Sequence, residues 1–244
     1  MESKIAGEII GSQYHIRKIF PFVMGTLYFT DRTSARGDDE KRFVHALAMP
    51  SNASSSLIEE LGLRDDMIFM PLENIFIEQN NLYQVFIRME GGLLAYQIRK
   101  RSFSLEEMSW LVAGICSQLL RLELEGQFTL VHPQNIIITK SGAIRFLYGG
   151  KRGLLPKHLG RLSKQTEEQI RTDRLYDVYL IGVLIFQILT GKHPVEWGLQ
   201  VPPLKLVRPD IPEELDQIVS RALSFNLASR PQIEEIMSLL KRVG

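Results

Sequence analysis

The sequence has few of the features that mark secreted, membrane-spanning or strongly charged proteins. Cys116 is the only cysteine, which excludes an internal disulfide and a metal site built from cysteines. The 29 basic and 28 acidic residues give a net charge of +1, so no strong field favours nucleic acid or an anionic membrane surface. The longest apolar run, 178–189, is interrupted by Gln187 and is shorter than the ~20 residues that span a bilayer.

The same absences favour an intracellular protein. Residues 1–10 contain no apolar core segment of the kind that a signal peptide needs. A single cysteine also suits a reducing compartment. We therefore expect a cytoplasmic protein with no membrane segment, no nucleic-acid partner and no bound metal.

Hydrophobic periodicity divides the chain into two parts. The 244 residues are 45% hydrophobic and 23% charged, which is ordinary globular composition. Before residue 90 the period is two, which predicts strands, with one short helix over 54–61 and a hairpin turn at Asn80-Asn81. The strands are expected over 14–20, 26–30, 42–49, 67–70, 75–78 and 82–89.

After Gly91-Gly92 the period rises to about 3.6 residues, which predicts helices. Ser104 and Glu107 form a capping box, in which each side chain bonds the other residue's backbone amide, at the start of an amphipathic helix. Short strands are expected over 135–139 and 143–147, followed by an irregular basic stretch to Lys164. Further helices are expected over 176–189, 213–223 and 232–242. This pattern alone predicts an α+β fold.

Several motifs in the second half resemble those of a bacterial Ser/Thr protein kinase domain. They are GQFTLVHPQNIIITKSGAIRFLYGG over 126–150, Thr-Glu-Glu-Gln over 166–169, Asp-Val-Tyr-Leu-Ile-Gly over 177–182, Leu-Thr-Gly-Lys-His-Pro over 189–194, and Arg230-Pro231. The resemblance runs from about Gly11 to Leu240. It implies a single two-lobed domain over 1–244, with a β-rich N-lobe over about 1–89, a hinge over about 88–92 and a helical C-lobe over about 92–244.

The resemblance also implies structural roles for three residues. Asp177 would hold the backbone of the catalytic loop. Glu168 and Arg230 would form a buried ion pair, in which loss of either partner should cost ~3–5 kcal/mol because the other charge stays buried.

The catalytic positions of the family are degenerate here. Leu130 falls on the general base, and a leucine cannot accept the proton whose transfer is typically worth ~10²–10⁴ in rate. His132 falls on the loop lysine, although we favour the interpretation that it is an ordinary loop histidine. Asn135 matches the second magnesium ligand, but an amide binds magnesium poorly without an anionic partner.

The carboxylate that would bind magnesium together with Asn135 is missing from the motif at residues 148–150. Tyr148, Gly149 and Gly150 fall on the Asp-Phe-Gly motif, and a phenol with a pKa of ~10 stays neutral at physiological pH. The two glycines predict an unusually free turn.

The strands that correspond to the nucleotide-binding strands of the family also lack most of its usual glycines and its lysine. Gly25 is the one glycine retained from the phosphate-covering loop, where Phe22 and Met24 now stand. Leu47 or Ala48 falls on the strand lysine, so its helix partner, Glu59 or Glu60, should be solvated.

We therefore interpret the chain as a pseudokinase: not an enzyme, with no cofactor and with weak or absent ATP binding. It would serve bacterial signalling by binding another protein, through the substrate-side groove of the C-lobe, the basic segment 149–164, or a shallow apolar cleft. That cleft would be lined near Phe22, Gly25, Leu47, Phe86, Met89, Asn135 and Tyr148. The alternative is that these side chains fill the cleft as core.

A second hypothesis remains open. The chain could be a weakly active or atypical ATP-dependent Ser/Thr kinase, or a nucleotide sensor, supported by Asn135 and Gly25.

Overall fold

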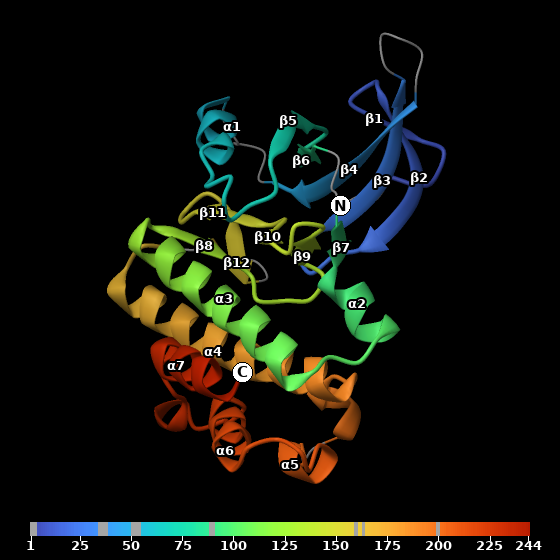
Figure 1. Ribbon diagram of the computed structural model, residues 1–244. Helices are drawn as coiled ribbons and strands as arrows, with labels where there is room; N and C mark the ends of the chain where they lie inside the picture. Colours follow the sequence, from blue (N-terminus) through green and yellow to red (C-terminus); the bar gives the residue numbers. More distant parts are fainter. Residues whose placement is uncertain are drawn as a thin grey trace.

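The computed structural model describes residues 4–33, 39–49, 55–87, 91–158, 161–162, 164–198 and 201–244. A curled sheet with one helix stacks on a helical part, and short strands lie between them (Figure 1). The expected α+β fold with a β-rich first part and a helical second part is confirmed.

The N-terminal sheet is antiparallel, with strand order β1-β2-β3-β4-β6-β5. Its elements are β1 (Ile9–Ile10), β2 (Tyr14–Pro21), β3 (Thr26–Thr33), β4 (Asp39–Ala48), the helix α1 (Ser55–Gly62), β5 (Leu72–Glu78) and β6 (Asn81–Phe86). The predicted hairpin joins β5 and β6, and its turn residues Gln79 and Asn80 have positive φ values of 50° and 60°. Positive φ at both central turn positions matches the strand twist and fixes the register.

The sheet buries side chains on both faces because strand residues alternate in direction. On β4, Val44 and Ala46 join a cluster with Tyr14 and Tyr83 on one face. His45 and Leu47 point to the opposite face, which lies toward the C-terminal part and forms the cleft described below.

The second part surrounds two long helices. Its elements are β7 (Gly91–Leu93), α2 (Leu94–Lys100), α3 (Leu105–Leu124), β8 (Gln127–Thr129), β9 (Ile136–Thr139), β10 (Ile144–Phe146), β11 (Gly149–Lys151), β12 (Pro156–His158), β13 (Arg161–Leu162), α4 (Glu167–Thr190), η1 (Pro194–Trp197), α5 (Leu204–Val207), α6 (Glu213–Ala222), η2 (Leu227–Ser229) and α7 (Ile233–Val243). Helix α4 is the buried centre, packed between α3 and α6, and it ends at Gly191 with φ 73°.

Two sequence expectations are corrected. Residues 67–70 form a turn with one isolated parallel bridge, Phe69 to Phe146, instead of a strand. The turn forms because Asp65 accepts the backbone amides of Met67, Ile68 and Phe69 through its side chain and its carbonyl. The basic stretch is not irregular, because it contains the short strands β11, β12 and β13.

Some expectations cannot be compared with the structure. Met89, the helix cap expected at Ser54 and most of the expected hinge lie outside the described residues. Within the described residues, no helix is both long and apolar enough to cross a bilayer.

The capping box of α3 is present as predicted, and it generates a test. The Ser104 hydroxyl accepts from the Glu107 amide at 3.0 Å, and the Glu107 carboxylate accepts from the Ser104 amide at 2.9 Å. Ser104→Ala should lower the free energy of unfolding by about 1 kcal/mol and Tm by about 2–4 °C. Exposed Ser102, whose side chain makes no hydrogen bond, supplies the control Ser102→Ala. Equal Tm values for both variants would contradict the role of the cap.

Candidate functional site

Asn135 is the buried anchor of the catalytic-loop region. Its amide nitrogen donates to the Thr129 hydroxyl at 3.1 Å, to the Leu130 carbonyl at 2.9 Å and to the Tyr148 carbonyl at 3.2 Å. Its amide oxygen accepts from the Tyr148 backbone amide at 2.7 Å. The side chain is fully buried, so these bonds use its donors and occupy its oxygen. The residue at the position of the family's second magnesium ligand therefore joins the loop to the strand at Tyr148.

Tyr148 fills the position where the family has the aspartate of Asp-Phe-Gly. Its ring is fully buried and meets the rings of His45 and Phe128 edge-on, with centroids 5.5 and 6.3 Å away. Its hydroxyl donates to the Pro156 carbonyl at 2.6 Å. Burial raises the pKa of this phenol far above its ordinary value, so it stays neutral.

His45 links the loop after β2 to the cleft. Its Nε2 bonds the Met24 carbonyl, its Nδ1 lies 3.2 Å from Gln84 Oε1, and Phe22 packs on its ring at 5.0 Å. Burial lowers the pKa of this imidazole, so it is neutral. Gly25 allows the arrangement: at φ 85°, a Cβ would lie 2.2 Å from the Ala46 carbonyl oxygen. Gly25 therefore serves close packing on β4.

The side chains of the expected cleft bury one another. Phe22, Met24 and Leu47 from the sheet share one core cluster with Leu130 and Tyr148 from below. Each of these five is less than 10% exposed, and Phe86 is fully buried in the same cluster. For the described residues, the alternative that they fill the cleft as core is therefore confirmed.

Gly149 and Gly150 are held firmly, which corrects the expectation of a free turn. They pair with Thr129 and Phe128 of β8 at φ values of 144° and 145°. A Cβ on Gly149 would lie 2.3 Å from the Phe128 carbonyl oxygen and 2.7 Å from the Phe69 ring. Phe69 thus occupies the space beside the position where the family has a phenylalanine.

Arg64 brings a buried guanidinium beneath this turn. It donates to the Leu147 carbonyl at 2.9 Å and to the Met70 carbonyl at 2.7 Å, and it lies over the Phe69 ring at 4.8 Å. Burial lowers the pKa of Arg64 from 12.5 to about 9. No carboxylate of the described residues forms an ion pair with it, so backbone carbonyls and an aromatic face hold this charge.

Asp177 does not hold the catalytic-loop backbone, which corrects the role expected for it. It forms a buried ion pair with Lys157 at 2.6 Å, in which the two side chains are 8% and 1% exposed. Burial raises the pKa of Asp177, and the Lys157 charge opposes that rise. The carboxylate of Asp177 accepts a hydrogen bond from Lys157, which belongs to the segment that follows Tyr148.

A second buried acid lies one helical turn earlier. Asp173 is fully buried and bonds Arg152 at 2.6 Å, His158 at 3.0 Å and Gln169 at 2.7 Å. Burial alone would raise the pKa of Asp173, but the Lys157 charge and these hydrogen bonds hold it below its ordinary value. Arg152 and Lys157 point inward, so these two cations of the segment 149–164 are not available to a partner.

The expected ion pair between Glu168 and Arg230 is absent. Glu168 is exposed in the first turn of α4, where a carboxylate favours the helix N-terminus. Arg230 donates instead to the carbonyls of Ser224 at 3.1 Å and Leu175 at 2.8 Å, and it lies over the Tyr179 ring at 5.1 Å. Nε and one Nη of Arg230 are directed to these carbonyls and not to Glu168, so the predicted pair does not form; the other Nη makes no hydrogen bond to a described residue.

Glu60 and His132 both bond other residues of the chain. Glu60 is not merely solvated, because it pairs with Lys151 at 2.6 Å and so ties α1 to the strand after Tyr148. His132 Nδ1 accepts from the Gln134 amide at 3.2 Å, and burial lowers its pKa. This is the ordinary loop histidine that the sequence allowed.

The donor set does not fit the magnesium ion of the family. The Asn135 amide oxygen already accepts the Tyr148 backbone amide, and Tyr148 offers a neutral phenol bonded elsewhere, so no carboxylate of the described residues accompanies Asn135 here. Within the described residues, no cluster of three or more His, Cys, Asp or Glu side chains could hold a metal.

Sequence reasoning missed His45, Arg64, Asp173, Arg152 and Lys157. One signal was available for three of them. Asp173 and Asp177 are four residues apart at the start of an otherwise apolar helix, so they share the face that must be buried. Buried acids need cations, and the preceding basic stretch supplies them.

Comparisons with known proteins identify the fold. No protein-family model matches the chain. The kinase domain of Mycobacterium tuberculosis PknI superposes with a TM-score of 0.64 at 16% identity, covering 99% of this chain and 100% of that one. Another crystal structure of that domain gives a TM-score of 0.65 at 18% identity over 98% of both chains. The chain therefore has a two-lobed protein kinase-like fold.

Curated relatives are bacterial. The probable serine/threonine-protein kinase PknB of Lactococcus lactis is 24% identical over 129 residues, which is 43% of this chain. Serine/threonine-protein kinase PrkC of Bacillus subtilis is 22% identical over 225 residues, which is 82% of this chain. The aligned segments span 21% and 33% of those two proteins. The resemblance to bacterial Ser/Thr protein kinase domains is thus confirmed.

The same finding overturns the expectation that the chain is not an enzyme. These relatives are named as protein kinases, and the similar structures are kinase domains, so the comparisons point to an enzyme. The expectation relied on residue identities at single positions, whereas the comparisons cover the domain.

The Lys157–Asp177 pair generates a stability prediction. Lys157→Met should lower the free energy of unfolding by about 3–5 kcal/mol, because Asp177 keeps a buried charge without its partner. The double variant Lys157→Met/Asp177→Leu should recover most of that loss, because no unpaired charge remains. Chemical denaturation of both variants measures this. A loss below about 1 kcal/mol in the single variant would show that the pair is unimportant.

His45 generates a pH prediction. Its pKa is lowered in the folded state, so the unfolded chain binds the proton more readily. This contribution to stability is full above about pH 6.5 and is lost as the pH falls toward the lower folded value. His45→Gln should therefore show a smaller fall in Tm between about pH 7 and 5 than the wild type. His15→Gln is the control, and parallel curves for His45→Gln and the wild type would refute the assignment.

Proposed function

We propose that this kinase-like domain acts in bacterial signalling as a regulatory module that binds another protein, from a cytoplasmic location. In this conformation nucleotide affinity is weak. The observation that carries the proposal is the Tyr148 ring, which is buried among cleft side chains at the position that resembles the metal-binding aspartate of the family. A domain whose cleft is filled by its own side chains presents a fixed outer surface, and such a surface suits recognition of another protein.

The relatives favour a second candidate function. They are named serine/threonine-protein kinases, so phosphoryl transfer is the activity to test beside binding. Transfer would need a conformation in which Tyr148 has left the cleft and Asn135 has released at least one partner. A kinase of this kind would act on protein hydroxyl groups in an atypical way, without the usual base and lysine.

One experiment separates the two candidates. Tm is measured with and without millimolar ATP, each with and without magnesium, and transfer from labelled ATP to a generic protein substrate is measured in parallel. A ligand at ~100 times its Kd adds ~2.7 kcal/mol, which is roughly 5–10 °C for a chain of this size. We expect a shift below about 1 °C for the wild type. A magnesium-dependent shift would contradict the weak nucleotide affinity that the proposal gives to this conformation, and transfer would favour the kinase candidate.

A variant pair tests the role of the ring. Tyr148→Ala removes the buried side chain, so any ATP-dependent shift should be larger than in the wild type. Tyr96→Ala removes a tyrosine that is 53% exposed on α2, outside the cleft, and should leave the ATP response unchanged. Equal responses from both variants would show that Tyr148 is not what limits the nucleotide.

A further inference from the structure

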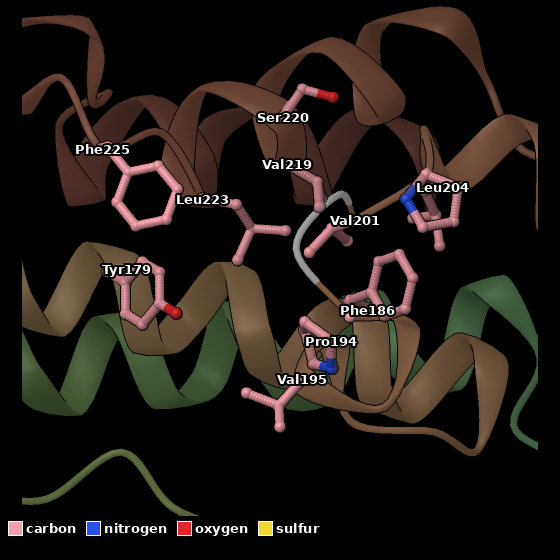
Figure 2. A pocket seen from close by; sticks show the side chains of 12 residues that line it. Tyr179, Phe186, Pro194, Val195, Val201, Leu204, Val219, Ser220, Leu223 and Phe225 are labelled. Atoms are coloured by element: carbon pink, nitrogen blue, oxygen red, sulfur yellow. The ribbon is translucent and has the colours of Figure 1, made fainter.

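An apolar hollow lies in the helical part, away from the cleft. It has a volume of about 340 Å³, which is at the lower end for ligand-binding pockets. Figure 2 shows Val219, Leu223 and Phe225 facing Tyr179 and Phe186 of α4 across it. Phe225 is 95% exposed and Val195 on the rim is 73% exposed. Aromatic side chains that stand free at the edge of an apolar hollow mark an interaction surface.

A second hollow joins the first. Phe225 lines both, and Arg230 of the second lies over Tyr179 of the first at 5.1 Å. The second hollow is lined by Arg171, Arg174 and Arg230 against one carboxylate, Glu168. Its charge is therefore positive on balance.

Two of these guanidiniums have no acidic partner in the described part of the chain. Arg174 pairs with Glu123 at 3.6 Å and with Glu234. Arg230 donates only to backbone carbonyls, and exposed Arg171 makes no side-chain bond there. Guanidiniums bind carboxylates in a fixed, often bidentate geometry, so a partner's acids complement them.

We propose that these joined hollows bind a segment of a partner protein that carries one large apolar side chain and acidic residues near it. The apolar side chain would enter the hollow between α4 and α6, beside Phe225. The acidic residues would lie along Arg171 and Arg230. This inference rests on the proposed protein-binding function, and it names the surface and the chemistry of the partner.

The probe is a panel of fluorescein-labelled peptides of about a dozen residues, measured by fluorescence polarisation. Each carries one Phe, Trp or Leu anchor with two to four Asp or Glu residues on either side. Matched peptides replace the anchor by Ser or the acids by Lys. We expect the anchored acidic peptides to bind, and the matched peptides to bind at least about tenfold more weakly. Binding should also weaken as salt rises.

Matched protein variants locate the site. Phe225→Ala and Arg171→Glu should each raise Kd about tenfold, and both side chains are exposed, so folding should not suffer. Leu206→Ala and Lys241→Glu alter an exposed apolar residue and an exposed cation that line neither hollow, and they should leave Kd within about twofold.

Three results would overturn the inference. One is that no anchored acidic peptide binds; another is that binding survives Phe225→Ala and Arg171→Glu. The third is concentration-dependent self-association that Phe225→Ala abolishes, which would assign the surface to a second copy of the chain. If the panel fails while ATP gives no shift, only this surface is refuted. If magnesium-ATP shifts Tm, the weak nucleotide affinity stated under the proposed function is refuted, whatever the peptide panel shows.

Discussion

The buried amide of Asn135 fixes the relation between the loop at 129–135 and the strand at Tyr148. Three of its four hydrogen bonds satisfy backbone groups on both segments, and the fourth reaches the Thr129 hydroxyl, at a fully buried side chain. Unsatisfied buried polar groups cost about 1–3 kcal/mol each, so neither segment can move alone without that penalty. With its backbone held here, Tyr148 extends its ring into the cleft and its hydroxyl to Pro156.

The buried charges on α4 act on the same segment from below. Asp173 and Asp177 take Arg152 and Lys157, which follow Tyr148 closely in sequence. Buried ion pairs add little net stability, but breaking one is costly because the remaining charge is unpaired. They therefore specify where the segment lies more than they stabilise the domain. Glu60 adds a more exposed tie from α1 to Lys151, so the strand after Tyr148 is held from both parts of the molecule.

The sequence predicted the elements well where local rules decide, and poorly where long-range pairing does. The capping box at Ser104, the hairpin at Asn80 and the buried helix over 176–189 follow from local rules and were correct, although α4 starts nine residues earlier, at Glu167. The strand predicted over 67–70 failed because Asp65 accepts the backbone amides of that segment. The Glu168–Arg230 pair failed for another reason: the resemblance supplied the partner, but Arg230 is directed to the carbonyls of Ser224 and Leu175.

At the site, residue identities predicted which groups were missing but not what replaced them. Leu130 and Tyr148 were identified as unable to serve as base and metal ligand, which is a matter of functional groups alone. That Asn135 would bond Tyr148, or that His45 would anchor the loop above Tyr148, depends on contacts between residues that are separated in sequence. No periodicity or spacing contains that information.

The comparisons and the site together raise the question of what it costs the Tyr148 ring to leave the cleft. The relatives are named as kinases, yet the position that resembles their metal-binding aspartate holds a fully buried tyrosine ring here. Exposing a large apolar side chain costs about 1.5–3 kcal/mol, before the hydroxyl's bond to Pro156 is counted. If only the open state binds nucleotide, its apparent affinity falls by the fraction of molecules that are open. An opening cost of about 3 kcal/mol would weaken binding by roughly 150-fold. A partner that stabilised the open state would remove that cost, so binding of a protein and binding of a nucleotide would be coupled through the position of Tyr148.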